Sequence, residues 1–207
     1  QFCNLFNSLL VNLIEALDQY RTEFVNFYHE TTAQVDHVDM LALQGTWSHR
    51  ADFIKFLEEY LQFCAAHFSS VHFISSITAL KLFPAQLCKI VDFYLRIKIS
   101  HLQQEAAVTS LVREFILLFS TRGAIEQAIY LAEEFFDFDS LIDLLYVLGD
   151  RNRLFDTIAS YTSQGIVGHL YCYFKEKKLF SEIVHVDWYV YWEEFYATAK
   201  ASKDKDL

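Results

Sequence analysis

AIEQAIYLAEEFFDFDSLIDLLYVLGDRNRLFDTIASYTSQGIVGHLYCYFKEKKLFSEIV, residues 124–184, is a run of short amphipathic segments separated by Gly and Asp. Apolar residues recur at spacings of three and four, which is the period of an α-helix with one buried face. Asp139 and Asp150 suit the N-caps of two helices, and Gly149 supplies the left-handed conformation that commonly ends a helix. We expect about five helices of roughly 8–13 residues with joints of about two to five residues, which makes neighbouring helices antiparallel.

The composition of the whole chain favours the same class of fold. The 207 residues are 53% hydrophobic and 17% aromatic, and they include only five glycines and one proline. A β-sandwich or barrel needs turn residues every 8–12 positions or so, and too few are present. No G-x-G-x-x-G or G-x-x-x-x-G-K nucleotide-binding motif occurs. The sequence therefore predicts an all-α fold, arranged as an irregular α-solenoid of stacked antiparallel helix pairs.

The helical pattern changes along the chain. We expect residues 1–207 to be a single segment of a longer helical-stack domain, with longer helices over 1–120, short helix-pair repeats over 121–199 and a frayed polar tail over 200–207. The first helix, over 2–28, is apolar on two sides and therefore needs neighbours on two sides, as an inner helix of a stack does. Pro84 is expected in the first turn of a helix, where its missing N–H removes no hydrogen bond.

Net charge and cysteine content limit the classes of partner and the cellular compartment that we expect. The net charge is −10, whereas nucleic-acid binding needs a basic stripe, so we expect no direct nucleic-acid partner. The four cysteines are widely spread in apolar surroundings, which favours a reduced intracellular compartment over a disulfide scaffold. Residues 60–80 carry no Asp, Glu, Lys or Arg, but their histidines and serines favour a buried helix and a turn over a transmembrane segment.

Three constellations could carry chemistry, and a structural role is favoured for each. Cys64, His67 and His72 supply three potential zinc ligands where a structural site has four, so no metal or other cofactor is expected. His169 precedes Cys172 by three residues on one helix, which is thin support for a nucleophile. The loop residues Asp36, His37 and Asp39 are read as solvated. We therefore predict no catalytic residues, no cofactor and no small-molecule substrate.

The last helix has a different character. It carries large aromatic residues at helical spacing, and Trp and Tyr dominate the energetic hot spots of protein interfaces. The residues predicted to bind a partner are Trp188, Tyr189, Trp192, Phe195 and Tyr196. The alternative is that this stripe packs on the preceding helix pair or on residues outside this segment.

The order of several motifs over residues 132–184 resembles the helical domain of the nucleoporin 133/155 class. These motifs are Asp137-Phe138 after an aromatic helix end, Gly149-Asp150 at a joint, Arg153-Leu154 after it, and an aromatic helix with a basic end over 171–178. A tryptophan that the family often carries in the aromatic helix is absent, and Tyr173 or Phe174 would fill its place. Clathrin heavy chain and vacuolar-sorting solenoids use similar Gly-Asp joints.

The resemblance implies a non-enzymatic scaffold protein of the nuclear pore outer ring, the Y-shaped complex, at the nuclear envelope. Its partners would be other scaffold nucleoporins, within the machinery of protein and mRNA transport. A clathrin-like or vacuolar-sorting coat or tether solenoid in membrane trafficking is the first alternative. An all-α enzyme that uses Cys172 or the Cys64 region is the second.

Overall fold

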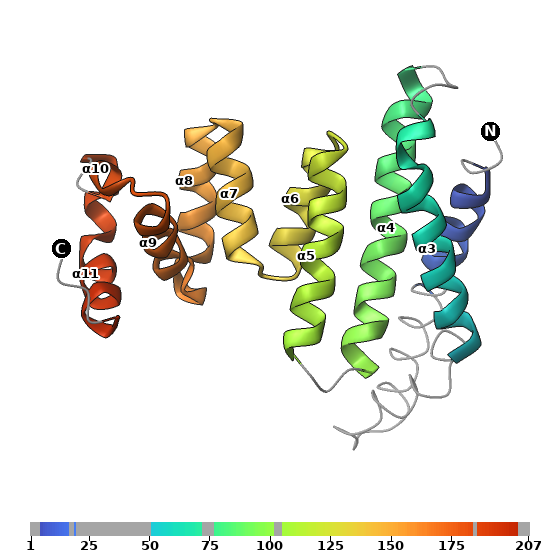
Figure 1. The fold of residues 1–207 in the computed structure, drawn as a ribbon, viewed down its shortest axis with the longest axis horizontal. Coiled ribbons are helices and arrows are strands. Elements are labelled where there is room, and N and C mark those ends of the chain that lie inside the picture. Colours follow the sequence, from blue (N-terminus) through green and yellow to red (C-terminus); the bar gives the residue numbers. More distant parts are fainter. Residues whose placement is uncertain are drawn as a thin grey trace. The chain divides into compact units, whose positions relative to one another are not determined.

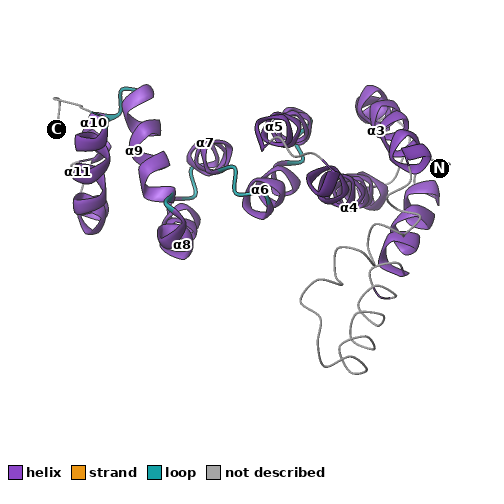
Figure 2. Cartoon of the chain, turned by 90° about the horizontal axis from the view of Figure 1, so that it is seen from below, coloured by secondary structure: helices purple, strands orange, loops and turns teal. Residues whose placement is uncertain are grey.

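Helices make up the regular structure of this protein wherever the chain is described. The computed structural model describes residues 5–16, 19, 51–71, 77–101, 105–183 and 186–202, and Figures 1 and 2 show helices and loops over these ranges, without a strand. The all-α prediction is therefore confirmed for the described residues. The chain divides into two compact units, Gln1–Gln127 and Ala128–Leu207. The α-solenoid arrangement itself stays a prediction.

The first unit contains long helices. Residues 5–16 are helical, and α3 (Ala51–Val71), α4 (Ile77–His101) and α5 (Glu105–Thr121) contain 21, 25 and 17 residues. Aromatic side chains join them, because Phe68 of α3 meets Phe83 of α4 at 5.5 Å and Phe119 of α5 at 6.0 Å, both edge to face. Tyr94 of α4 contacts Phe115 of α5 in the same geometry. The core of this unit thus combines ring contacts between helices with buried aliphatic side chains such as Leu57, Ile90 and Leu95.

The helix over residues 5–16 buries one of its two apolar sides. Leu10 and Ile14 are buried, whereas Leu9 and Leu13 are exposed. Asn7 is also buried, and it accepts a hydrogen bond from the Tyr60 hydroxyl of α3. The buried side is therefore the one that contains Leu10 and Ile14, and the opposite stripe faces solvent. The remainder of the helix predicted over 2–28, apart from residue 19, lies outside the described residues.

The placement of Pro84 corrects the prediction from the sequence. Helix α4 begins at Ile77, so Pro84 lies inside the helix instead of in its first turn. An interior proline removes one backbone hydrogen bond and crowds the carbonyl four residues earlier. Together these effects destabilise the helix by about 3 kcal/mol or more. Phe83 and Leu87 on either side of it are almost completely buried. Burial of two large apolar side chains contributes a comparable free energy, which keeps the helix continuous.

The second unit contains short helices. In chain order these are α6 (Ile125–Glu134), in which the division between the units falls, α7 (Phe138–Leu148), α8 (Arg151–Tyr161), the 3₁₀ turn η2 (Thr162–Gln164), α9 (Ile166–Glu176), α10 (Phe180–Ile183), the 3₁₀ turn η3 (Val186–Tyr191) and α11 (Trp192–Ala201). Helix α7 packs against both α8 and α9, and α9 packs against α11. Alternate helices of this unit therefore contact one another, in addition to consecutive ones.

A residue with left-handed backbone conformation recurs at the joints between these short helices. Among the described residues, five have a positive φ: Gly123 (76°), Phe136 (54°), Gly149 (75°), Gly165 (89°) and Lys178 (58°). Each follows the end of a helix or of η2, and successive ones are 13, 13, 16 and 13 positions apart. The longer interval is the one that contains the three residues of η2. The joints are thus regular in spacing even though the sequence at them differs.

Hydrogen bonds show how these joints close. The amide of Asp137 donates to the carbonyl of Ala132 at 2.9 Å, and the amide of Leu179 donates to the carbonyl of Phe174 at 2.7 Å. This six-to-one bond, made just after a left-handed residue, is the Schellman closure of a helix end. Glycine adopts the left-handed conformation without strain, whereas Phe136 and Lys178 adopt it at a cost in free energy.

Aspartates occupy the N-cap positions of α7 and α8, and one of them differs from the prediction. Asp150 caps α8 as predicted, because its carboxylate accepts a hydrogen bond from the amide of Arg153 at 3.1 Å. The N-cap of α7 is Asp137 instead of the predicted Asp139. Because the left-handed Phe136 ends the preceding turn early, α7 begins at Phe138 and Asp139 falls inside its first turn.

Candidate functional site

Trp188 belongs to the core of the second unit. Its ring stacks on Phe155 of α8 with 4.2 Å between centroids and meets the edge of Phe174 of α9 at 5.6 Å. Only 2% of its surface is exposed. Its predicted role in partner binding therefore needs correction, since this side chain anchors η3 to α8 and α9.

Phe195 is buried as well. None of its surface is exposed, and its ring lies 6.1 Å from Tyr171 and 6.5 Å from Phe174, both on α9. Gly168 of α9 also lies against α11. A Cβ built on this glycine would lie 3.6 Å from the hydroxyl oxygen of Thr198, which is one turn after Phe195. The inner side of α11 thus packs on α9, which is the alternative that the sequence analysis left open.

The other three residues of the predicted set remain at the surface. The exposed fractions are 75% for Tyr189, 57% for Tyr196 and 36% for Trp192. In a 3₁₀ helix the side chains at i and i+3 lie above one another, and in an α-helix those at i and i+4 share a face. Tyr189, Trp192 and Tyr196 therefore form one continuous line, here named the outer aromatic stripe.

A change of helix type separates the two sets of aromatics. Trp188, Trp192 and Phe195 have the spacing of one α-helical face, but residues 186–191 are 3₁₀ and only Trp192 begins the α-helix. A 3₁₀ helix has about 3.0 residues per turn instead of about 3.6, so the face that points inward shifts at the junction. No residue in the sequence marks this change, so α-helical spacing alone predicts one face for Trp188, which is buried, and Trp192, which is exposed.

Polar and apolar residues that the sequence does not single out lie beside the outer aromatic stripe. Val190 is largely exposed, and Glu193 and Lys200 are exposed on α11. Glutamate and lysine on a surface helix carry no functional signal by themselves, since such residues usually form its solvated side. Glu193 and Lys200 are candidates for an interaction surface because they lie beside exposed aromatic rings, and this position is known only from the fold.

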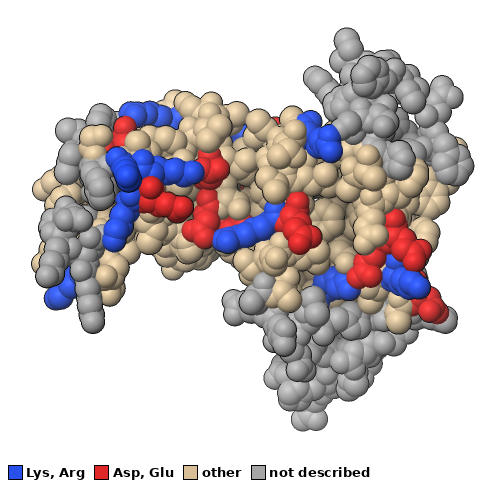
Figure 3. Space-filling model, in the orientation of Figure 1, with Lys and Arg blue, Asp and Glu red and all other residues tan. Residues whose placement is uncertain are grey.

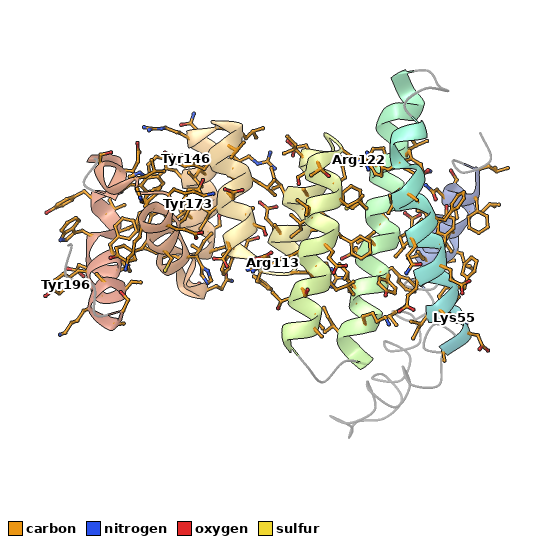
Figure 4. The ribbon with its side chains drawn as sticks, in the orientation of Figure 1. Lys55, Arg113, Arg122, Tyr146, Tyr173 and Tyr196 are labelled. Atoms are coloured by element: carbon orange, nitrogen blue, oxygen red, sulfur yellow. The ribbon has the colours of Figure 1, made fainter. Side chains whose placement is uncertain are left out.

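Helices α7 and α9 form a polar seam along one side of their contact. Asp139 pairs with His169 at 2.7 Å, and Asp143 pairs with Lys177 at 3.4 Å. Tyr173 lies between them, and Figure 4 shows it close to Tyr146. Burial, assisted by the charge of Asp143 and a hydrogen bond to it, raises the pKa of Tyr173 to about 12. These contacts hold two helices together, and His169 is engaged with a carboxylate of another helix.

The cysteines do not favour nucleophilic chemistry. Cys64 and Cys88 are buried, and burial together with the charge of Asp92 raises the pKa of the Cys88 thiol to about 12. Cys172 is exposed, but partial burial of its thiol and the charge of Asp139 raise its pKa too. A reactive cysteine needs the opposite shift, because the thiolate is the nucleophile. The reading of Cys172 with His169 as a catalytic pair therefore gains no support.

No group of three or more potential metal ligands occurs among the described residues. Cys64 is described, whereas the side chains of His67 and His72 lie outside the described part of the chain. The loop residues 36–39 are outside it as well.

Charge is mixed over the surface. On the face drawn in Figure 3, Lys and Arg alternate with Asp and Glu, and the basic residues form no separate stripe within the parts that are described. Of the helices in the described ranges, none is both long and apolar enough to cross a lipid bilayer.

The sequence was also compared with known proteins. No protein-family model matches it, and no curated protein matches it significantly.

Proposed function

We propose that this chain is a structural scaffold segment of the nuclear pore outer ring, acting through protein–protein contacts at the nuclear envelope and without catalysis. The main support for the proposal is where the residues that resemble the nucleoporin 133/155 class lie in the fold. Gly149 ends α7 with a left-handed φ of 75°, Asp150 caps α8, and Leu154 is buried one turn later. Residues that resemble the nucleoporin class are thus the ones that build the helix joints.

The second half of the resemblance lies in the core. Tyr171 and Phe174, from the aromatic helix, are both almost completely buried, and they face α11. A scaffold works by holding surfaces at fixed angles, so it needs joints that do not bend and helices locked by large side chains. Left-handed helix ends at regular intervals and shared aromatic rings supply both properties.

The contacts between alternate helices add to this proposal. In a protein made of stacked helix pairs, each pair contacts its neighbours, so that helices two apart in the chain lie against one another. The pairs α7 with α9 and α9 with α11 have this relation. The contact between α7 and α9 includes the Asp143–Lys177 ion pair and the Tyr146–Tyr173 ring contact.

Affinity purification tests the proposal. The tagged chain is expressed in the cells from which the sequence comes, and the recovered proteins are quantified by mass spectrometry, with fluorescence imaging of the same fusion. We expect enrichment of outer-ring nucleoporins and a signal at the nuclear rim. The control is Phe174→Asp, which places a charge in the core of the second unit and should lose both. Recovery with coated-vesicle or tethering components would contradict the proposal and favour a trafficking coat.

A further inference from the structure

Two opposite charges flank the outer aromatic stripe. Glu193 and Lys200 lie seven positions apart on α11, close to two full turns, so they project from the same side of the helix as Tyr196 between them. Figure 4 shows Tyr196 projecting from α11. Glu193 and Lys200 are about 10 Å apart along the helix axis, which is too far for an ion pair within the helix. In the described part of the chain, neither has an ion-pair partner on another element.

This order of residues is complementary to itself. An acid precedes Tyr196 by three positions and a base follows it by four. Two such helices packed antiparallel across a two-fold axis would place each acid opposite the other helix's base. We propose that the outer aromatic stripe pairs with the same surface of a second copy of this chain, with Tyr196 near the axis and Glu193 against Lys200 of the second copy. A two-fold contact of this kind uses the same patch on both subunits.

The exposed aromatic area limits the size of this contact. Tyr189, Tyr196 and Trp192 are 75%, 57% and 36% exposed. With about 200 Å² for a full aromatic side chain, the stripe offers roughly 300–400 Å² per copy, or about 700 Å² in the pair. Stable interfaces bury about 1,200–2,000 Å². The dimer is therefore weak, and it forms at high local concentration, as in the proposed scaffold assembly if that assembly holds several copies.

Charge favours a second copy over other occupants. An acidic partner would meet Glu193 and Glu194, and a basic partner would meet Lys200, whereas an identical surface satisfies both signs at once. Anionic lipid is disfavoured for the same reason, because two carboxylates lie beside the stripe. The net charge of −10 opposes association at long range, but salt at about 0.15 M screens it beyond about 8 Å.

Charge reversal tests the proposal. Sedimentation equilibrium of the 207-residue chain, from about 5 to 500 µM in physiological salt, should show a monomer–dimer equilibrium. Glu193→Lys and Lys200→Glu should each raise the Kd about tenfold, because two symmetric attractions become repulsions. The double variant should return the Kd to within about twofold of the starting value, since it restores both pairs with exchanged signs.

Further variants separate this contact from other surfaces. Tyr196→Ala should raise the Kd about tenfold and leave the melting temperature nearly unchanged, because its ring is mostly outside the core. Leu9→Glu, on the exposed side of the first helix, should leave the Kd unchanged. A chain that stays monomeric at the highest concentration would overturn the proposal and leave the stripe to an unlike partner. A double charge variant as weak as the single ones, or loss of the dimer in Leu9→Glu, would also overturn it.

Discussion

Adjacent residues Trp188 and Tyr189 should differ sharply in their contribution to stability. Trp188→Ala removes a ring that is 98% buried, or about 200 Å² of surface, which at about 25 cal/mol per Å² amounts to about 5 kcal/mol. A compact unfolded state already buries part of that area, so the loss is about 4 kcal/mol. This lies within the range of about 3–5 kcal/mol for truncation of a buried tryptophan. Tyr189→Ala, at a mostly exposed position, should change the free energy of unfolding by at most about 0.5 kcal/mol.

Urea unfolding followed by far-ultraviolet circular dichroism measures the difference. With an m-value of about 2 kcal/mol per molar urea, Trp188→Ala should lower the midpoint by about 2 M, whereas Tyr189→Ala should leave it in place. Trp188→Phe is the matched control, because it keeps a ring over Phe155 and should recover more than roughly half of the loss. Equal effects of the two alanine variants would refute the division of the aromatics into an inner and an outer set.

Glycines and ionisable groups provide three further expectations. Gly149→Ala should lower the free energy of unfolding by about 1 kcal/mol, because φ is 75° at this position. Gly168→Ala should raise it by about 0.5–1 kcal/mol, because this glycine lies inside α9 and there is room for a Cβ. Thermal unfolding shows whether each variant is less or more stable than the original chain. A hydrogen bond from Lys98 lowers the pKa of Glu58 from 4.5, so this stabilisation is present above about pH 4.5 and is lost as the pH falls through the lowered value. Chemical unfolding between pH 3 and 7 should show that Lys98→Met removes this part of the pH dependence. Alkylation of Cys172 by iodoacetamide should keep accelerating above pH 9, since its pKa is raised from 9.0; a rate that levels off near neutral pH would contradict this.

Most of the short helices could be predicted from the sequence, because the helical spacing of apolar residues and the positions of Gly and Asp at the helix ends agree there. The positions of Gly149 and Asp150 follow directly from the needs of a helix end and a helix start. The left-handed Phe136 and Lys178 could not be predicted, since neither residue type favours that conformation. They adopt it because the helices on both sides are fixed by burial, and this shifted the start of α7 away from Asp139.

The interaction surface was harder to predict than the helices. Helical spacing predicts one face for Trp188, Trp192 and Phe195, with Tyr189 and Tyr196 beside it. Only the 3₁₀ segment over 186–191 shows that Trp188 and Phe195 are buried while the other three are exposed. The interior Pro84 has a similar origin, because local preference gave way to the burial of its neighbours. Local rules therefore describe where helices begin and end, while tertiary packing decides which side of the last helix meets solvent.

The regular spacing of left-handed residues bears on how such a chain can change its length. In a stack of antiparallel helix pairs, as predicted for this chain, removing one helix together with its joint reverses the direction of every helix that follows, whereas removing two restores it. Length variants should therefore differ by helix pairs, about 26 residues at a time, and should keep the joints unchanged. The three residues of η2 illustrate the other route, in which a small addition is absorbed within a single connection before α9 starts. Natural variants with an odd number of inserted helices should be rare, because the surfaces after the insertion would face the wrong way.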